Sequence, residues 1–281
     1  MIERANCFHP DKIADRIAGA IVDLAYTKSE NPKVACEVLI GHGECNIIIE
    51  TSEKFTQKQI EKIVHRISNP EVTVNLKVVP QDPHLAHNQA EEVRCGDNGI
   101  FKGVPLTNEE ITLSRIAREI TEKYPYDGKY IYDKDESKLI ICQSNISEDE
   151  ANSLITHFKL TEGIRNVIAN PLGPWTGGID VDSGATNRKL GSDMAQSVTG
   201  GGLFGKDISS KADVCCNIWA FVKAQETNKI VTLNCAIGDT EVTGKIGNKK
   251  IKIPYKEIAD FARDYIKGLG GLEAFAEWGL Y

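Results

Sequence analysis

The hydrophobic positions of the first eighty residues predict one compact α/β unit. Apolar residues recur at helical spacing over 11–26, where Ile13, Ile17 and Ile21 fall on one face. The apolar segments 34–40 and 46–49 predict two strands of a hairpin, with a glycine-containing turn at 41–44. A second amphipathic helix over 56–67 and a strand over 72–79 complete the unit. The order is helix, strand, strand, helix, strand.

The same order of patterns returns twice further along the chain. We expect helices over 106–123, 148–158, 211–223 and 255–267, and strands over 129–133, 138–143, 164–169, 229–237, 241–246 and 250–253. The sequence therefore predicts an α/β (α+β) protein of three similar units, an N-terminal unit at 1–82, a central unit at 104–176 and a C-terminal unit at 177–281. The polar stretch 83–103 between the first two shows no periodicity, and we interpret it as a lid or linker loop.

Composition narrows the classes of function. The chain has 281 residues and a net charge of −7, which disfavours a broad nucleic-acid-binding surface. No apolar run approaches the length of a membrane span. Eight cysteines occur without any Cys-x-x-Cys pair, which favours reduced thiols in a cytoplasmic protein over a disulfide framework or a zinc site.

The most informative segment is Gly200-Gly201-Gly202-Leu203-Phe204-Gly205-Lys206-Asp207. Four glycines in six residues leave backbone amides free to approach an anion, and Lys206 adds positive charge. The segment matches the first seven positions of the P-loop pattern, but Asp207 stands where that pattern requires Ser or Thr. The pattern of residues 193–199 does not predict the buried strand that should precede a P-loop. We infer a polyphosphate site of another kind, with Lys211 and Asp213 close behind.

Other charged residues lie in patterns that allow two interpretations each. His9 and Asp11 stand at the start of the first helix, where they are either caps or anion-site residues. Glu37 and Glu50 interrupt apolar strands, so they either face solvent or hold a cation. Trp175 lies in a Gly/Pro-rich loop that is either a linker or a binding loop.

Two further short motifs are ambiguous. The segments around Asp97 (Gly-Asp-Asn-Gly) and Asp127 (Asp-Gly-Lys) are typical of simple turns, and alone they are weak hints of function.

Taken together, these motifs resemble the S-adenosylmethionine synthetase (methionine adenosyltransferase) family. The motifs run collinearly from residue 9 to 213 as His-Pro-Asp-Lys, Val-Ala-Cys-Glu, Ile-Glu-Thr, Gly-Asp-Asn-Gly, Asp-x-Lys, Asn-Pro-x-Gly, Asp-x-Gly-x-Thr-x-Arg-Lys and Gly-Gly-Gly-x-Phe-x-Lys-Asp. The resemblance implies three α/β units around a pseudo-threefold axis. It implies that ATP and L-methionine are joined to S-adenosylmethionine, with release of pyrophosphate and phosphate.

The resemblance also implies roles for individual residues and for cofactors. His9 would lie beside the ribose and the leaving oxygen, and the ATP-binding and triphosphate-neutralising set would be Asp97, Asp127, Lys129, Trp175, Asp182, Arg188, Lys189, Lys206 and Ile237. The methionine side would be Glu50, Gln81, Asp182 and Lys211. Asp11 and Asp213 would bind Mg²⁺, two ions per site, and Glu37 would bind K⁺. The partner would be a second copy of the chain, in a homodimer with shared active sites.

Two alternatives stay open at this point. A tripolyphosphatase or ATP hydrolase would keep the phosphate chemistry without methionine. A non-catalytic ATP-binding subunit would keep the fold without turnover. The nearly complete set of charged positions favours the active synthetase.

Overall fold

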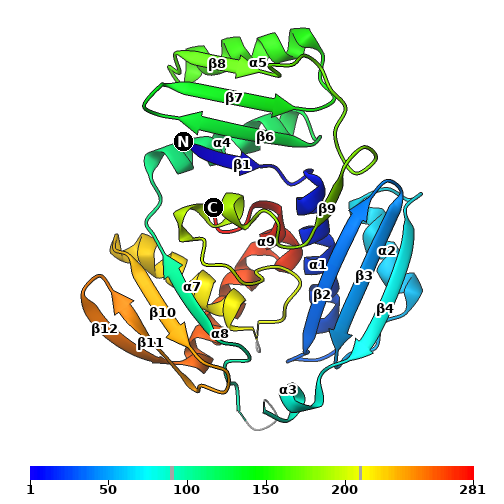
Figure 1. Cartoon of the computed structure of the whole chain (residues 1–281), viewed down its shortest axis with the longest axis vertical. Helices are drawn as coiled ribbons and strands as arrows, with labels where there is room; N and C mark the ends of the chain where they lie inside the picture. Colours follow the sequence, from blue (N-terminus) through cyan, green and yellow to red (C-terminus); the bar gives the residue numbers. More distant parts are fainter. Residues whose placement is uncertain (89–91, 209–210) are drawn as a thin grey trace.

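Three four-stranded sheets surround a group of central helices in the computed structural model, which describes residues 1–88, 92–208 and 211–281 (Figure 1). The first sheet has the strand order β4-β3-β2-β9, the second β1-β6-β7-β8 and the third β12-β11-β10-β5. The strands are β1 Ile2–Ala5, β2 Val34–Gly41, β3 Glu44–Thr51, β4 Thr73–Pro80, β5 Gly99–Gly103, β6 Gly128–Asp133, β7 Lys138–Gln143, β8 Asn166–Ala169, β9 Ser183–Ala185, β10 Val231–Cys235, β11 Glu241–Ile246 and β12 Lys249–Pro254.

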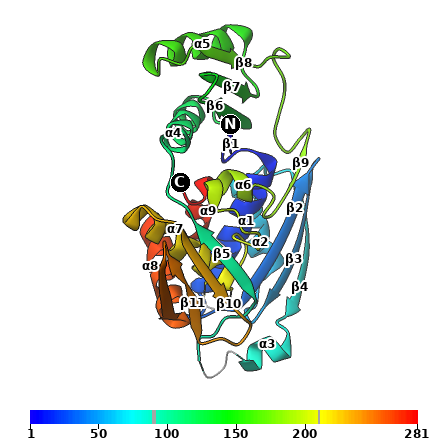
Figure 2. The ribbon, with the colours of Figure 1, turned by 60° about the vertical axis from the view of Figure 1, so that its left-hand side comes forward.

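The helices cover one face of each sheet. They are α1 Pro10–Tyr26, α2 Gln57–Ile67, α3 Pro83–Asn88, α4 Asn108–Lys123, α5 Glu148–Thr161, α6 Leu190–Asp193, a 3₁₀ turn at Ala195–Ser197, α7 Ala212–Thr227, α8 Tyr255–Leu269 and α9 Leu272–Trp278. In Figure 1, α1, α7, α8 and α9 lie in the middle of the molecule, and the second sheet lies at the top with α4 and α5. Figure 2 shows the second and third sheets at separate corners from another direction.

Each sheet contains one strand from a distant part of the chain. β1 pairs antiparallel with β6, β5 pairs antiparallel with β10, and β9 pairs antiparallel with β2. The three segments 1–82, 104–176 and 177–281 are therefore interlocked through their sheets. This exchange brings the start of α1 beside β9. There the side chain of Asp11 accepts a hydrogen bond from the backbone N–H of Ala185.

Two hydrophobic cores hold the sheets and helices together. The larger core joins the first and third sheets through the central helices, with Ile17, Ile47, Phe204 and Leu233 among its fully buried members. The smaller core lies between the second sheet and the helices α4 and α5, around Tyr130. The predicted mixed α/β fold is confirmed, and the structure contains three sheets as the three repeated patterns implied.

The main helices and strands follow the predictions, with local chemistry that explains their ends. α1 begins after His9, whose ring accepts a hydrogen bond from Asp11 N–H, and Pro10 occupies the first turn. α4 begins with a capping box between Thr107 and Glu110. In the described residues no helix is long and apolar enough to cross a membrane.

The interpretation of 83–103 as an irregular loop is wrong at both of its ends. Residues 83–88 form the short helix α3, and residues 99–103 form β5. α3 did have a local signal, since Asp82 accepts the His84 N–H and Pro83 opens the helix. β5 gave no local signal, because it takes its register from β10, more than a hundred residues further on. The short strands β1 and β9 escaped prediction for the same reason, while residues 89–91 lie outside the described part.

Candidate active site

The predicted site residues fall into three groups, and the first surrounds the start of α1. Asp11 is buried, and its Oδ2 lies 2.6 Å from the Lys189 ammonium. Its Oδ1 accepts the Ala185 N–H at 2.9 Å and lies 3.7 Å from the Arg188 guanidinium. Burial alone would raise the pKa of Asp11, but the hydrogen bonds from Lys189 and Ala185 outweigh burial and lower it. The first group thus contains an ionised carboxylate beside two cations.

His9 stays neutral in this environment. Burial and the nearby Lys189 lower the pKa of the imidazole to about 4, although Asp11 opposes the shift. Its Nδ1 accepts the Asp11 N–H at 3.2 Å. In a neutral imidazole with Nδ1 as acceptor, the proton is on Nε2. His9 therefore offers Nε2–H as a hydrogen-bond donor.

Four further predicted residues join this group, which we call the Asp11 group. Lys129 and Asp182 both lie close enough to act electrostatically on His9 and on Asp127. Burial raises the pKa of Asp127 to about 6, against a hydrogen bond from Gly178 N–H. The loop that carries Trp175 lies against Asp127. A side chain at Gly177 in this loop would meet both Trp175 and Asp127.

The second group lies on the uncovered face of the first sheet, and we call it the Glu37 group. Lys206 Nζ lies 2.5 Å from Glu37 Oε1, and the Thr186 hydroxyl donates to Glu37 Oε2, also at 2.5 Å. Lys206 forms an isolated β-bridge with Ala35, which is paired with Glu50 on β3. Gln81 follows β4, and its N–H donates to Thr51 O at the same end of the sheet.

The third group, the Asp213 group, lies between the glycine run and the third sheet. Gly202 N–H donates to Asp213 Oδ2 at 3.3 Å, and burial raises the pKa of Asp213 in spite of that bond. Lys211 lies 3.9 Å from Asp97, and Ile237 N–H donates to Asn98 at 2.8 Å. Ile237 and Trp175, both expected at the adenine, therefore belong to different groups.

Asn187 connects the Asp11 group with the glycine run, and sequence reasoning missed it. Its Oδ1 accepts the N–H groups of Leu203 and Phe204, both at 2.9 Å. Its own N–H donates to the buried Asp15. Asn187 has a φ of 64°, a conformation that asparagine adopts more readily than most residues. An asparagine directly before Arg188-Lys189 was the available signal.

Other charged residues of the motifs have structural roles. Asp207 is buried, and its side chain accepts the Val34 N–H at 3.0 Å, so it fixes the glycine run to β2. Gly205 is required there, because a side chain would meet Cys36 O at 2.1 Å. Lys12 forms a fully buried ion pair with Asp193 at 2.7 Å, which ties α1 to α6.

Asp11 and Glu37, the carboxylates expected to bind Mg²⁺ and K⁺, each already lie beside an ammonium group. Among the described residues, no group of three or more acidic, histidine or cysteine side chains forms a metal cage. Mg²⁺ commonly binds through one or two carboxylates together with substrate phosphates, and Asp11 and Asp213 each offer one carboxylate. Both oxygens of Glu37 already have partners, so K⁺ would have to displace the Lys206 ammonium group there, as Mg²⁺ would have to displace Lys189 at Asp11.

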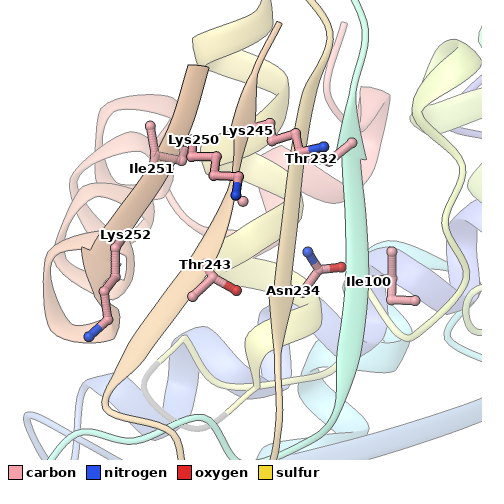
Figure 3. Close-up of a pocket in the computed structure, with 9 residues that line it drawn as sticks. Ile100, Thr232, Asn234, Thr243, Lys245, Lys250, Ile251 and Lys252 are labelled. Atoms are coloured by element: carbon pink, nitrogen blue, oxygen red, sulfur yellow. The ribbon is translucent and has the colours of Figure 1, made fainter. Parts of the chain in front are cut away.

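The uncovered face of the third sheet carries a shallow cavity of about 710 Å³, apart from most of these residues (Figure 3). Thr232, Asn234 and Thr243 form its floor, with Ile100 at one side. Lys245, Lys250 and Lys252 surround it, so this surface is basic although the whole chain is acidic. None of these residues was singled out from the sequence.

The fold and these groups together define a three-sheet α/β protein with cationic side chains around a neutral histidine and a glycine-rich loop. Comparison with known proteins agrees. Residues 3–79 match the family model for the N-terminal domain of S-adenosylmethionine synthetase. The S-adenosylmethionine synthase of Mycoplasma mycoides subsp. mycoides is 28% identical over 258 residues, a match that covers 73% of this chain and 66% of the relative. That of Sulfurimonas denitrificans is 27% identical, over 93% of this chain and 84% of the relative.

Structural comparison shows a shared fold. A solved structure of an unusual S-adenosylmethionine synthetase from Campylobacter jejuni matches with a TM-score of 0.73 and 19% identity, over 100% of this chain and 94% of that one. The comparisons support a divergent, compact member of the S-adenosylmethionine synthetase family, which the motifs also indicated.

Proposed function

We propose that this chain is a methionine adenosyltransferase, which makes S-adenosylmethionine from ATP and L-methionine. The observation that carries the proposal is the convergence of Lys189, Arg188 and Lys129 on a neutral His9 and an ionised Asp11. A thioether sulfur has no proton to remove, so attack on C5′ of ATP needs no general base. It needs alignment and stabilisation of the charge on the departing triphosphate.

The residues of the Asp11 group can supply this stabilisation. The Nε2–H of His9 would donate to the leaving oxygen, and the lysine and arginine side chains would bind the triphosphate oxygens. Trp175, which is 38% exposed, would stack on the adenine. Bound Mg²⁺ would add positive charge at the phosphates, held by Asp11 and Asp213.

We propose that the complete site is shared between two copies of the chain. Trp175 follows β8 of the second sheet and Ile237 follows β10 of the third sheet, and these two sheets lie at separate corners of the molecule in both views (Figures 1 and 2). A second copy could bring its own Asp213 and Glu37 groups opposite the Asp11 group of the first. Such a homodimer would also cover sheet faces that now expose Leu39, Ile48 and Ile100.

We place the enzyme in the cytoplasm. All eight cysteines are free thiols in the structure, in keeping with a reducing compartment.

The proposal is tested by incubating the protein with ATP, L-methionine, Mg²⁺ and K⁺ and measuring S-adenosylmethionine by mass spectrometry. We expect the product, together with pyrophosphate and phosphate, and roughly 10²- to 10³-fold slower formation of it by a Lys189→Met variant. Phosphate release without methionine and without a sulfonium product would instead identify an ATP or tripolyphosphate hydrolase. ATP binding without any turnover would identify a non-catalytic subunit.

A further inference from the structure

Three cysteine thiols meet at the end of β10, directly beside the Asp213 group. Cys235 is the last residue of β10 and is partly exposed. Cys95 lies in the segment before β5, Cys216 lies on α7, and both are fully buried. The thiols of Cys95 and Cys216 both hydrogen-bond to the sulfur of Cys235. Three separate segments of the chain thus converge on one sulfur atom.

The surroundings of Cys235 favour its thiolate. Two thiols and the Gly99 N–H donate hydrogen bonds to its sulfur. These bonds lower the pKa of Cys235, against the opposing effects of burial and of the nearby Asp239. The same contacts raise the pKa of Cys95 and Cys216, so these two stay protonated. A partly exposed thiolate beside two protonated thiols is an arrangement suited to oxidation.

We propose that Cys235 is a site of reversible oxidation by peroxides, with Cys95 as its disulfide partner. In the first step the Cys235 thiolate attacks one oxygen of hydrogen peroxide, which gives a sulfenic acid and hydroxide. In the second step the Cys95 sulfur attacks the sulfenic sulfur, its proton leaves with the displaced hydroxyl as water, and a disulfide forms. A dithiol such as dithiothreitol reverses the reaction.

Cys95 is favoured over Cys216 as the partner by its position in the chain. Cys95 N–H donates to Asp239 O at 2.9 Å, and Gly238 N–H donates to Cys95 O at 2.8 Å. These bonds keep Cys95 against the turn that follows Cys235. Cys95 belongs to an irregular segment, whereas Cys216 is fixed within α7.

The disulfide would act on the neighbouring site residues. Asp97 and Asn98 follow Cys95 closely, the Cys235 sulfur lies 3.6 Å from Asp97 O, and Asn98 accepts a hydrogen bond from Ile237 N–H. We therefore expect oxidation to shift the Asp213 group and to reduce turnover. This effect on turnover rests on the proposed function, whereas the oxidation itself does not.

The experiment treats the whole protein with hydrogen peroxide and maps disulfides by mass spectrometry, with a dimedone probe to trap sulfenic acid. Cys142 is the matched control, because it is also partly exposed but burial raises its pKa. We expect a Cys95–Cys235 disulfide in the wild type and a trapped sulfenic acid at Cys235 in Cys95→Ser. Cys142 should stay unlabelled in both, and Cys142→Ser should behave as wild type.

The outcomes separate the parts of the proposal. Absence of oxidation at Cys235 in wild type and Cys95→Ser, both checked for native fold by circular dichroism, would overturn it. A Cys216–Cys235 disulfide would overturn Cys95 as the partner. If the reduced protein makes no S-adenosylmethionine but the Cys95–Cys235 disulfide forms, the proposed function fails while the oxidation site stands.

Discussion

Lys189 donates a hydrogen bond to the buried carboxylate of Asp11, with 2.6 Å between Nζ and Oδ2. This bond joins the first turn of α1 to the segment that follows β9, two parts of the chain nearly 180 residues apart (178). It holds a cation beside the neutral His9, where we expect the leaving triphosphate to bind.

Lys189→Met should lower kcat/KM for ATP roughly 10²- to 10³-fold, because one preorganised cation at a developing charge contributes about 3–4 kcal/mol. Steady-state kinetics with both substrates measure this effect. Lys223→Met is the control, since Lys223 is also partly buried and ion-paired, with Glu226, but lies on α7 away from the site groups. A loss below tenfold for Lys189→Met would refute a role for Lys189 in transition-state stabilisation.

Asp127→Asn should stabilise the fold at neutral pH but not in acid. The folded protein raises the pKa of Asp127 from 3.8 to about 6, so it binds the proton more tightly than the unfolded chain does. This contribution to stability is complete below pH 4 and is lost as the pH rises through 6. A pKa shift of this size corresponds to at most about 3 kcal/mol of unfolding free energy. Asparagine does not ionise, so the variant does not lose this stability as the pH rises.

Urea unfolding of the variant and the wild type across pH 4 to 8 checks this expectation. The difference in unfolding free energy should grow in favour of the variant as the pH rises. The exposed Asp135→Asn is the control and should show no such trend. A constant difference across the range would contradict the role assigned to burial.

Asn187→Ala should destabilise the protein more than Asn228→Ala. Both asparagines have a positive φ, 64° and 52°, so alanine strains the backbone equally at the two positions. Only at Asn187 does the side chain accept two buried backbone N–H groups, and leaving them without an acceptor costs about 1–3 kcal/mol each. Thermal or urea unfolding measures the difference. Equal losses would show that those hydrogen bonds contribute little.

Replacing K⁺ by tetramethylammonium at constant ionic strength should leave most of the activity. The Lys206 ammonium already lies against the carboxylate at which K⁺ was expected, Glu37. Glu37→Gln should instead raise the KM for ATP, because it removes the partner that orients Lys206. Strong activation of the wild type by K⁺, lost in Glu37→Gln, would favour a potassium ion bound at Glu37.

Mixing two inactive variants should restore activity if two copies share each site. Lys189→Met changes the Asp11 group and Lys211→Met changes the Asp213 group, so a heterodimer of the two keeps one intact site. At equal concentrations, full subunit exchange should recover about a quarter of the wild-type rate. Mixing Lys189→Met with Arg188→Met is the control, because both changes fall in one group. No recovery in the first mixture, with exchange verified by mass spectrometry, would argue against shared sites.

The sequence alone determined the main elements and the residues of the candidate site. Helical spacing of apolar residues defined α1, α4 and α8, because a buried helix face requires that period. The collinear motifs identified His9, Asp11, Arg188 and Lys189, since short charged and glycine-rich segments keep their chemistry wherever the fold places them.

Only the tertiary structure decided which residues meet. The short strands β1, β5 and β9 have too few residues to show a period, and each is defined by a partner strand far away in sequence. Asn187, the Lys206–Glu37 pair and the three thiols around Cys235 depend on the same long-range contacts. A sequence pattern reports local periodicity and residue type, whereas these contacts follow from how the three sheets interlock.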